Sequence, residues 1–341
     1  MKLLDRLGNI EMEENEISVN SNGGTEQVKR MIGSMLPEGL LDDFQVICSR
    51  VRKIDESKIR VYWLHDLPED PETSHIKDKS SRDRFHKIVF CGNWQYNQYL
   101  TRLNLEPEEK FAVIDTPIIP FEDYTNYKGN NEEIRLIYTS TPQRGLTILV
   151  PVFIELAKKY PNIHLDVFSS FKIYGWDEAD KQFEPLYDMC RNHPQITYHG
   201  FAPNDVVRDH VSRANIFAYP SIWMECNSRA LIEAMSAGCI CVHPNLAGLS
   251  DTSGNLTDMY QFVSDQQLHA QLFYKKLDAA IDKVQNNHSF GSITQQRIYA
   301  NYRFDAKRIA KQWENMLLEL KEKYPEGTRA PVKNLFVYKS N

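Results

Sequence analysis

The chain lacks the features that mark disulfide-rich, membrane-spanning and nucleic-acid-coating proteins. Its six cysteines stand mostly in apolar, strand-like runs, with neither paired spacings nor a Cys-x-x-Cys motif, which excludes an obvious disulfide framework or zinc finger. No stretch approaches the roughly 20 apolar residues of a membrane helix, and Met1–Gly8 has no signal-peptide core. The net charge of −6 gives no global attraction to nucleic acid. We expect a soluble, cytoplasmic protein with reduced thiols.

No repeat or low-complexity tract is present, and the length of 341 residues with 42% hydrophobic residues suffices for two cores. A loop from Pro117 to Asn131 separates two halves of different regularity. We expect an N-terminal domain over residues 1–130, a C-terminal domain over 131–303, and a helix and tail over 304–341 that pack back on the N-terminal domain.

The second half alternates strands with helices, which predicts a parallel, doubly wound sheet whose ligands lie beyond the carboxyl ends of its strands. The expected strands are 134–139, 164–168, 196–199, 216–219 and 239–242, and the expected helices are 146–159, 183–191 and 205–212. In the first half the expected strands are 44–48, 59–64, 87–91 and 111–114, with helices at 27–32 and 94–103. Its opening strand, 1–4, is brief, so this domain looks trimmed.

The segment Ser221–Gly238 is the most informative part of the chain, because it predicts a helix that starts directly after a buried strand. Asn227 or Ser228 is suited to cap this helix, and its closing glycine is suited to end it. Free N–H groups and the helix dipole attract an anion such as a diphosphate. Glu225 and Glu233 bracket the helix start, where carboxylates can accept hydrogen bonds from sugar hydroxyls. The segment is a candidate sugar-nucleotide site.

With Pro220-Ser221 before it and Glu-Ala-Met-Ser-Ala-Gly-Cys at its end, the segment resembles the Glu-x7-Glu signature of retaining GT-B glycosyltransferases (glycosyl transferases group 1, glycosyltransferase family 4-like). The resemblance implies an α/β protein of the GT-B class, with two Rossmann-like doubly wound domains facing a cleft. It also implies transfer of a hexosyl or pentosyl group from a nucleotide sugar to an acceptor hydroxyl, with retention. Acidic residues near a helix start also occur by chance in other α/β proteins.

The resemblance assigns roles at the glutamate helix. It implies that Glu225 binds hydroxyls of the donor sugar and takes part in catalysis, and that Glu233 binds the ribose. The helix start, with Asn227, Ser228 and Arg229, would bind the donor.

A second match lies in Thr139–Leu146, again strand, tight loop and helix. Arg144 would stabilise the charge that grows on the departing diphosphate. The family commonly has two basic residues here, but this chain has Thr139 and Ser140 at the earlier position. Arg229 is a candidate for the second cation, although an exposed helix arginine is the plainer interpretation.

Three further positions match more weakly. Gly23 and Gly24 precede a helix and would approach the donor phosphates or the acceptor, unless they form a plain tight turn. His65 ends an apolar strand and would lie by the reacting sugar, while Asp66 would contact the acceptor or orient the loop. Phe201 belongs to a loop that would hold the nucleotide base, or to an ordinary β-turn.

No Asp-x-Asp follows a strand, so we expect no metal and no other cofactor in the transfer. The donor would be a UDP-, GDP- or ADP-sugar, and the acceptor a glycan or other hydroxyl compound. One alternative is a phage-type enzyme that glycosylates hydroxymethylated bases in DNA, against which the acidic net charge argues mildly. Another is a non-catalytic nucleotide-sugar-binding protein.

Overall fold

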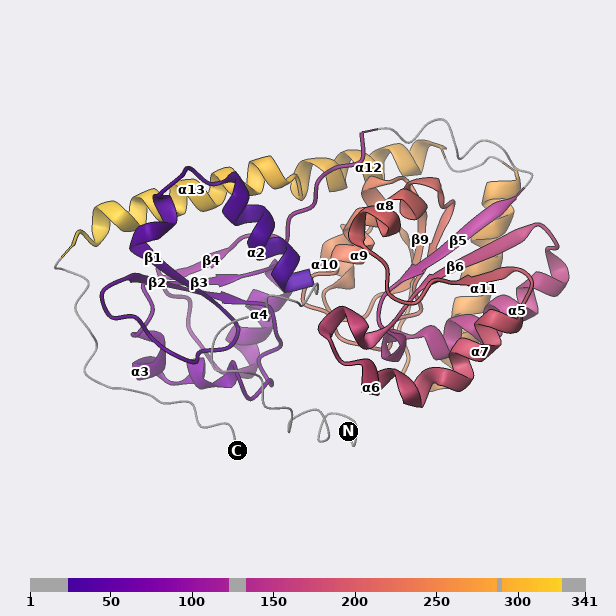
Figure 1. The fold of residues 1–341 in the computed structure, drawn as a ribbon, viewed down its shortest axis with the longest axis horizontal. Helices are drawn as coiled ribbons and strands as arrows, with labels where there is room; N and C mark the ends of the chain where they lie inside the picture. Colours follow the sequence, from indigo (N-terminus) through magenta and orange to yellow (C-terminus); the bar gives the residue numbers. More distant parts are fainter. Residues whose placement is uncertain (1–23, 123–132, 287–289, 327–341) are drawn as a thin grey trace.

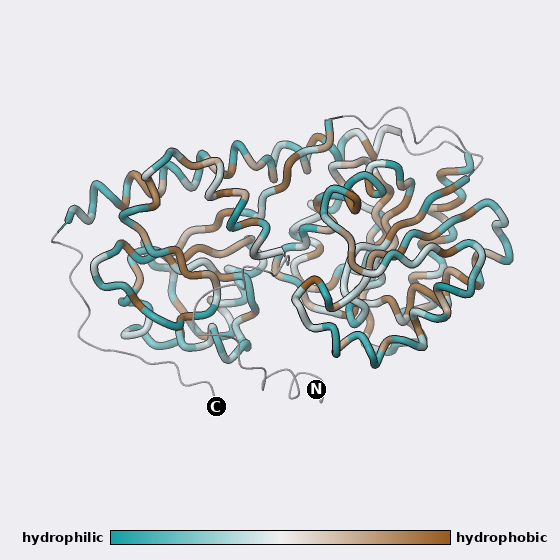
Figure 2. The backbone as a smooth tube through the Cα atoms, viewed as in Figure 1, coloured by the Kyte–Doolittle hydropathy of each residue, from teal (hydrophilic) through white to brown (hydrophobic). Residues whose placement is uncertain are grey.

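The computed structural model describes residues 24–122, 133–286 and 290–326, which form two lobes joined side by side (Figure 1). Apolar stretches follow the strands inside both lobes, while hydrophilic stretches lie on the outer helices and loops (Figure 2). Among the described residues, every helix is too short or too polar to span a lipid bilayer.

The N-terminal lobe has a parallel four-stranded sheet in the order β1-β2-β3-β4. Its strands are β1 (Phe44–Cys48), β2 (Ile59–Leu64), β3 (Lys87–Phe90) and β4 (Phe111–Val113). Every residue of β2 is buried, because helices cover both faces of the sheet. The helical elements of this part are α2 (Gly24–Met35), η1 (Leu40–Asp43), η2 (Ser74–Lys77), α3 (Lys79–Arg82) and α4 (Asn93–Arg102).

The C-terminal lobe has a parallel six-stranded sheet in the order β10-β9-β8-β5-β6-β7. Its strands are β5 (Ile134–Thr139), β6 (Ile163–Phe168), β7 (Ile196–Tyr198), β8 (Ile216–Ala218), β9 (Ile240–Pro244) and β10 (Asp258–Tyr260). The chain adds strands outward from β5 to β7 and then returns to place β8 on the other side of β5. This reversal makes a topological switch point between β5 and β8, where doubly wound sheets bind their ligands.

Helices cover both faces of the second sheet. One layer contains α5 (Leu146–Lys159), α7 (Glu184–Asn192) and α11 (Gln266–Gln285), and the other contains α8 (Asn204–Arg213), α9 (Arg229–Ser236) and α12 (Phe290–Arg303). The remaining short elements are η3 (Pro142–Arg144), η4 (Phe171–Tyr174), α6 (Asp177–Asp180), η5 (Lys181–Phe183) and α10 (Leu249–Ser253). Their apolar faces and the strands form one continuous core.

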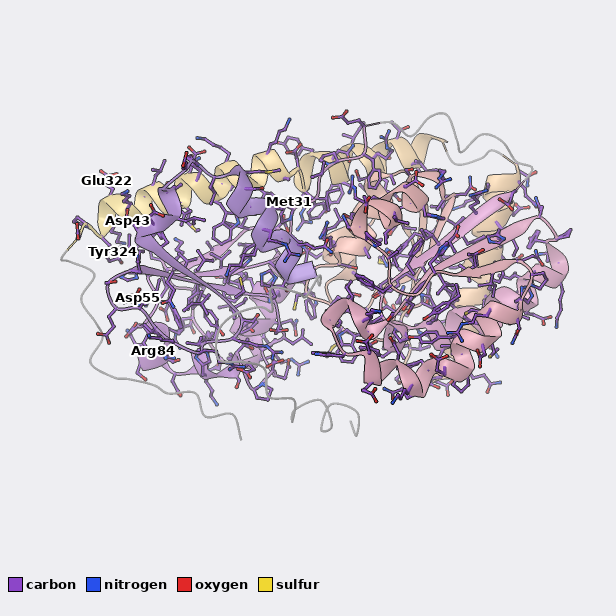
Figure 3. All side chains as sticks on the ribbon, viewed as in Figure 1. Met31, Asp43, Asp55, Arg84, Glu322 and Tyr324 are labelled. Atoms are coloured by element: carbon purple, nitrogen blue, oxygen red, sulfur yellow. The ribbon has the colours of Figure 1, made fainter. Side chains whose placement is uncertain are left out.

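The last helix, α13 (Ala306–Lys323), leaves the C-terminal lobe and lies along the N-terminal lobe (Figure 1). Trp313 packs against Trp63 of β2 with ring centroids 4.6 Å apart. Figure 3 shows Glu322 and Tyr324 at the end of α13 near Asp43, to which Lys321 forms a 2.6 Å ion pair. The N-terminal core is therefore completed by residues of α13.

The expected strands within the described residues are present, with ends that differ by at most two residues. Neither α11 nor α12 was among the helices expected from the sequence. For α12 the reason is physical, because this helix buries only a narrow face around Gln296 and Ala300 and carries no strong apolar stripe. The expected strand 1–4 and part of the expected linker lie outside the described residues.

Candidate active site

The loops that follow β5 and β8 meet at the switch point of the C-terminal sheet. The first loop turns through η3, which ends at Arg144, and then enters α5. The second loop runs from Tyr219 to Ser228, the residue before α9, and carries Glu225. Arg144 Nη1 lies 3.4 Å from Glu225 Oε1. The fold thus brings together a cation and a carboxylate that are far apart in sequence.

Two glycines, Gly145 before α5 and Gly248 before α10, allow their loops to approach the loop that carries Glu225. Gly145 has φ +130°, and a side chain there would collide with the carbonyl group of Pro220. A Cβ at Gly248 would meet the carbonyl oxygen of Glu225 at 2.6 Å, because the Gly248 N–H donates to that oxygen at 2.9 Å. Both loops therefore depend on glycine for their packing.

Glu225 is held from two sides. Its side chain is only 9% exposed, and Oε1 accepts a hydrogen bond from the hydroxyl of Tyr219 in addition to the contact with Arg144. Burial, and then the charge of Glu225, raise the pKa of Tyr219 above its ordinary value, so Tyr219 remains a donor. Within the described residues, Oε2 of Glu225 has no protein partner. That oxygen is the one suited to accept a hydroxyl of a ligand.

Glu233 lies on α9 and is also oriented by cations. Arg229 Nη2 lies 3.0 Å, and Arg208 Nη1 lies 3.2 Å, from Glu233 Oε1. Arg229 also donates to the side chain of Gln27 on α2, so it links the two lobes. The guanidinium of Arg229, the candidate for a second diphosphate-binding cation, therefore already binds Glu233 and Gln27 in this structure.

Ser228 is the residue that precedes α9, as predicted, but its hydroxyl makes no capping hydrogen bond. In the described part of the chain, seven buried polar atoms of the residues around the site have no hydrogen-bond partner: His65 Nε2, Thr141 Oγ1, Gln143 Oε1, Arg144 Nε, Asn227 Oδ1, Ser228 Oγ and Arg229 Nε. Buried polar atoms are normally paired, so these seven unpaired atoms are candidates to form hydrogen bonds with a polar ligand or with water.

His65 comes directly after β2, with its ring 4.5 Å from that of Trp63. Burial lowers the pKa of His65 to about 3, so the imidazole is neutral at physiological pH. The carbonyl of the next residue, Asp66, accepts hydrogen bonds from Gln95 Nε2 at 2.8 Å and from the Tyr99 hydroxyl at 3.2 Å. These hydrogen bonds hold the backbone directly after His65 in place.

Polar contacts between the lobes surround the site. Asp251 accepts from the backbone N–H of Trp94 at 3.1 Å and lies 3.3 Å from Arg303. Arg303 also pairs with Asp115 at 2.8 Å, and Asn227 Nδ2 reaches the same carboxylate at 3.5 Å. Asn227 thus contacts the N-terminal lobe through its amide nitrogen.

The remaining predicted site residues are more exposed. Phe201, 37% exposed, follows the left-handed Gly200 in the loop after β7. Gly24 is the first residue of α2, and a Cβ built there meets nothing within 4 Å among the described atoms. Gly23 lies outside the described residues.

The structure also shows site residues that the sequence analysis did not identify: Gln27, Arg208, Tyr219 and Gly248. Tyr219 had a usable signal, because it directly follows β8 and begins the loop that carries Glu225. Arg208 had none, since only the packing of α8 beside α9 brings it to Glu233.

Two α/β lobes and a switch point lined by carboxylates, an arginine and a helix start define a protein of the nucleotide-sugar-binding class. The profile of the family described as Glycosyl transferases group 1 matches residues 128–297, and the chain belongs to this family of glycosyltransferases. No curated protein sequence matches the chain.

Solved glycosyltransferases share the fold. The pneumococcal O-GlcNAc transferase GtfA in complex with UDP and GlcNAc matches at TM-score 0.64 and 15% identity, over 86% of this chain and 59% of GtfA. A glycosyltransferase from Rickettsia africae ESF-5 matches at 0.62 and 14%, over 94% and 87% of the two chains. Anabaena Alr3699/HepE in complex with UDP-glucose matches at 0.53 and 16%, over 77% and 72%. The expected GT-B fold is confirmed, and the chain spans about three fifths of the length of GtfA.

Proposed function

We propose that this protein is a retaining glycosyltransferase that moves a sugar from a nucleotide donor to an acceptor hydroxyl without a metal ion. The observation that supports this most is the carboxylate of Glu225, buried at the switch point between Tyr219 and Arg144. It stands within the segment that matches the family. A buried carboxylate with one oxygen anchored presents the other oxygen in a fixed direction, as a sugar-binding group requires.

The transfer would pass through an oxocarbenium-like transition state, in which negative charge grows on the departing diphosphate. Arg144 and the N-termini of α5 and α9 would stabilise that charge more than the charge of the intact donor. Glu225 would bind donor-sugar hydroxyls, and Glu233 would bind the ribose through the oxygen that its arginines leave free. His65, neutral and with Nε2 unpaired among the described residues, would lie by the reacting sugar.

A UDP-sugar is the first donor to test, because GtfA and HepE of similar fold were solved with UDP and UDP-glucose. The acceptor would be a glycan or another hydroxyl compound, bound between the lobes. A cytoplasmic location is part of the proposal, since all six cysteines are free thiols in the structure.

The donor site is tested by thermal shift and hydrolysis with UDP-, GDP- and ADP-sugars. We expect one nucleotide family to raise the melting temperature, and Glu233→Ala to abolish that increase. Glu155→Ala is the matched control, because Glu155 is an exposed helix glutamate paired only with Lys158. Stabilisation without any turnover would instead favour a non-catalytic nucleotide-sugar-binding protein, and no stabilisation by any donor would contradict the proposed function.

Metal independence has its own test. Turnover should persist in chelator, because no carboxylate pair is proposed to bridge a metal to the diphosphate. Activity that chelator abolishes and Mg²⁺ or Mn²⁺ restores would contradict this part of the proposal.

A further inference from the structure

A second polar cluster lies where β6, the loop after β7 and α8 meet. Asp166 Oδ1 is 2.7 Å from His199 Nε2 and 3.4 Å from His210 Nδ1. The three ligand-type atoms all lie within 4.8 Å of one another. None of these elements carries Glu225, Arg144 or His65, and the proposed transfer reaction does not use the cluster.

The carboxylate in this cluster lacks a permanent positive partner. The Asp166 side chain is 8% exposed, and within the described residues no lysine or arginine pairs with it. Taking a carboxylate out of water costs several kcal/mol unless a cation and hydrogen bonds compensate. His210 Nδ1 is buried and makes no hydrogen bond within the described part of the chain, so the cluster is incompletely satisfied.

The two imidazoles are held in place by their surroundings. The His199 ring stacks on Phe168 at 4.1 Å with an interplanar angle of 3°, and its backbone N–H donates to Val167. The His210 ring meets the same phenyl ring edge-on at 5.1 Å. Because aromatic packing holds both rings beside a buried carboxylate, a cation can be bound there with little rearrangement.

We propose that Asp166, His199 and His210 bind a zinc ion. Two imidazoles and one carboxylate form a typical zinc ligand set, with the fourth position left for water. At metal–ligand distances of about 2.0–2.2 Å, ligand atoms around a tetrahedral ion lie roughly 3.4 Å apart. The 3.4 Å separation of Asp166 and His210 fits this geometry. The 2.7 Å contact between Asp166 and His199 would lengthen on zinc binding, with the imidazole proton on Nδ1 so that neutral His199 binds the metal through Nε2.

The zinc would hold a loop and would not take part in the transfer. His199 begins the loop that contains Phe201, which we expect to contact the nucleotide base. The sequence led us to expect no metal, because no Asp-x-Asp follows a strand to bridge a metal to the diphosphate; the proposed zinc site departs from that expectation, and its ligands lie outside any such motif. The sequence showed no signal, because the three ligands stand on three separate elements.

Isothermal titration of the chelator-stripped full chain with Zn²⁺ tests the site. We expect one zinc per chain, with affinity reduced about 100-fold or more by His199→Ala or His210→Ala, since even indirect supports of metal ligands are worth 10–100-fold. His193→Ala is the matched control, because this histidine of the same lobe packs on Phe153. Zinc bound by the wild type and equally by His210→Ala would overturn the proposal, as would no stoichiometric binding.

A second measurement guards against variants that fold poorly. Co²⁺ added to the stripped wild-type chain should give the visible absorption of a bound low-coordinate ion. Asp166→Asn, which keeps the size of the side chain, should lose that absorption while its far-UV circular dichroism stays unchanged. If Asp166→Asn keeps both the Co²⁺ absorption and its circular dichroism, or if the wild type shows no Co²⁺ absorption, the proposal is overturned. The cluster would then be only a hydrogen-bonded network of imidazoles and a carboxylate.

Discussion

The two lobes use the same kind of layered parallel sheet but differ in strand order. The C-terminal sheet reverses between β5 and β8, which opens a crevice at the carboxyl ends of two adjacent strands. The described strands of the N-terminal sheet run in simple order from β1 to β4 and create no such reversal. The residues proposed to bind the donor accordingly lie mostly in the C-terminal lobe, and the N-terminal lobe contributes single candidate groups such as His65 and Gln27.

The lobes also differ in how their cores are completed. The C-terminal core is built from residues 118–304 alone. The N-terminal core includes Ile309, Trp313 and Leu317 of α13, which are separated in sequence from the strands they cover. The N-terminal lobe is therefore stabilised by a helix that follows the whole C-terminal lobe in the sequence.

The largest expected effect is the loss of stability of the N-terminal lobe when its packing against α13 is broken. Trp313 is 1% exposed against Trp63, so Trp313→Ala should destabilise the N-terminal lobe by about 3–5 kcal/mol. Hydrogen exchange should then rise over β1 to β4 and much less over β5 to β10. Leu318→Ala, at a position 47% exposed on the same helix, is the control. Equal loss of protection in both lobes would show that they unfold as one unit.

The next effect concerns catalysis in the C-terminal lobe. Arg144→Ala should lower kcat for donor hydrolysis by about 10²–10³-fold, because it removes a fixed charge from the proposed binding site of the departing diphosphate. Arg135→Ala, which removes an arginine 40% exposed on β5, should leave kcat unchanged. An unaltered kcat in Arg144→Ala would remove this residue from the catalytic site.

Gly145 and Gly24 lie at the starts of α5 and α2, so the same substitution can be compared in the two lobes. Gly145→Ala should cost about 1–3 kcal/mol of stability, because φ is +130° and a Cβ would strike Pro220. Gly24→Ala should leave stability almost unchanged, since nothing described lies within 4 Å of the new Cβ. If Gly24 approaches the donor or acceptor, its substitution should raise KM at constant melting temperature. Thermal melts and initial rates on both variants would separate these cases, and a normal KM would remove Gly24 from the site.

The difference between local sequence patterns and tertiary packing explains which parts of the fold and of the site could be predicted from the sequence. Strong strand–helix alternation and the Glu-x7-Glu segment located the C-terminal fold and the segment around Glu225. Side-chain partners such as Tyr219 and Arg208 depend on how α8, α9 and the strand ends pack, which no local pattern encodes. The missing cap at Ser228 is a second example, because the usual residue stands at the right position with its hydroxyl left unpaired among the described residues.

The smallest expected effect compares one buried histidine from each lobe. Burial, with the charge of Arg84, lowers the pKa of His75 to about 4, and burial lowers the pKa of His243 to about 4. The unfolded chain binds a proton near pH 6.5, so the stability from each neutral imidazole is complete above that pH and falls between about 6.5 and 4. At pH 5.5 each histidine should have lost about 1.4 kcal/mol. His75→Gln should weaken the acid sensitivity of hydrogen exchange in the N-terminal lobe, and His243→Gln that of the C-terminal lobe. Identical pH profiles in the wild type and both variants would mean that neither imidazole is kept neutral by its lobe.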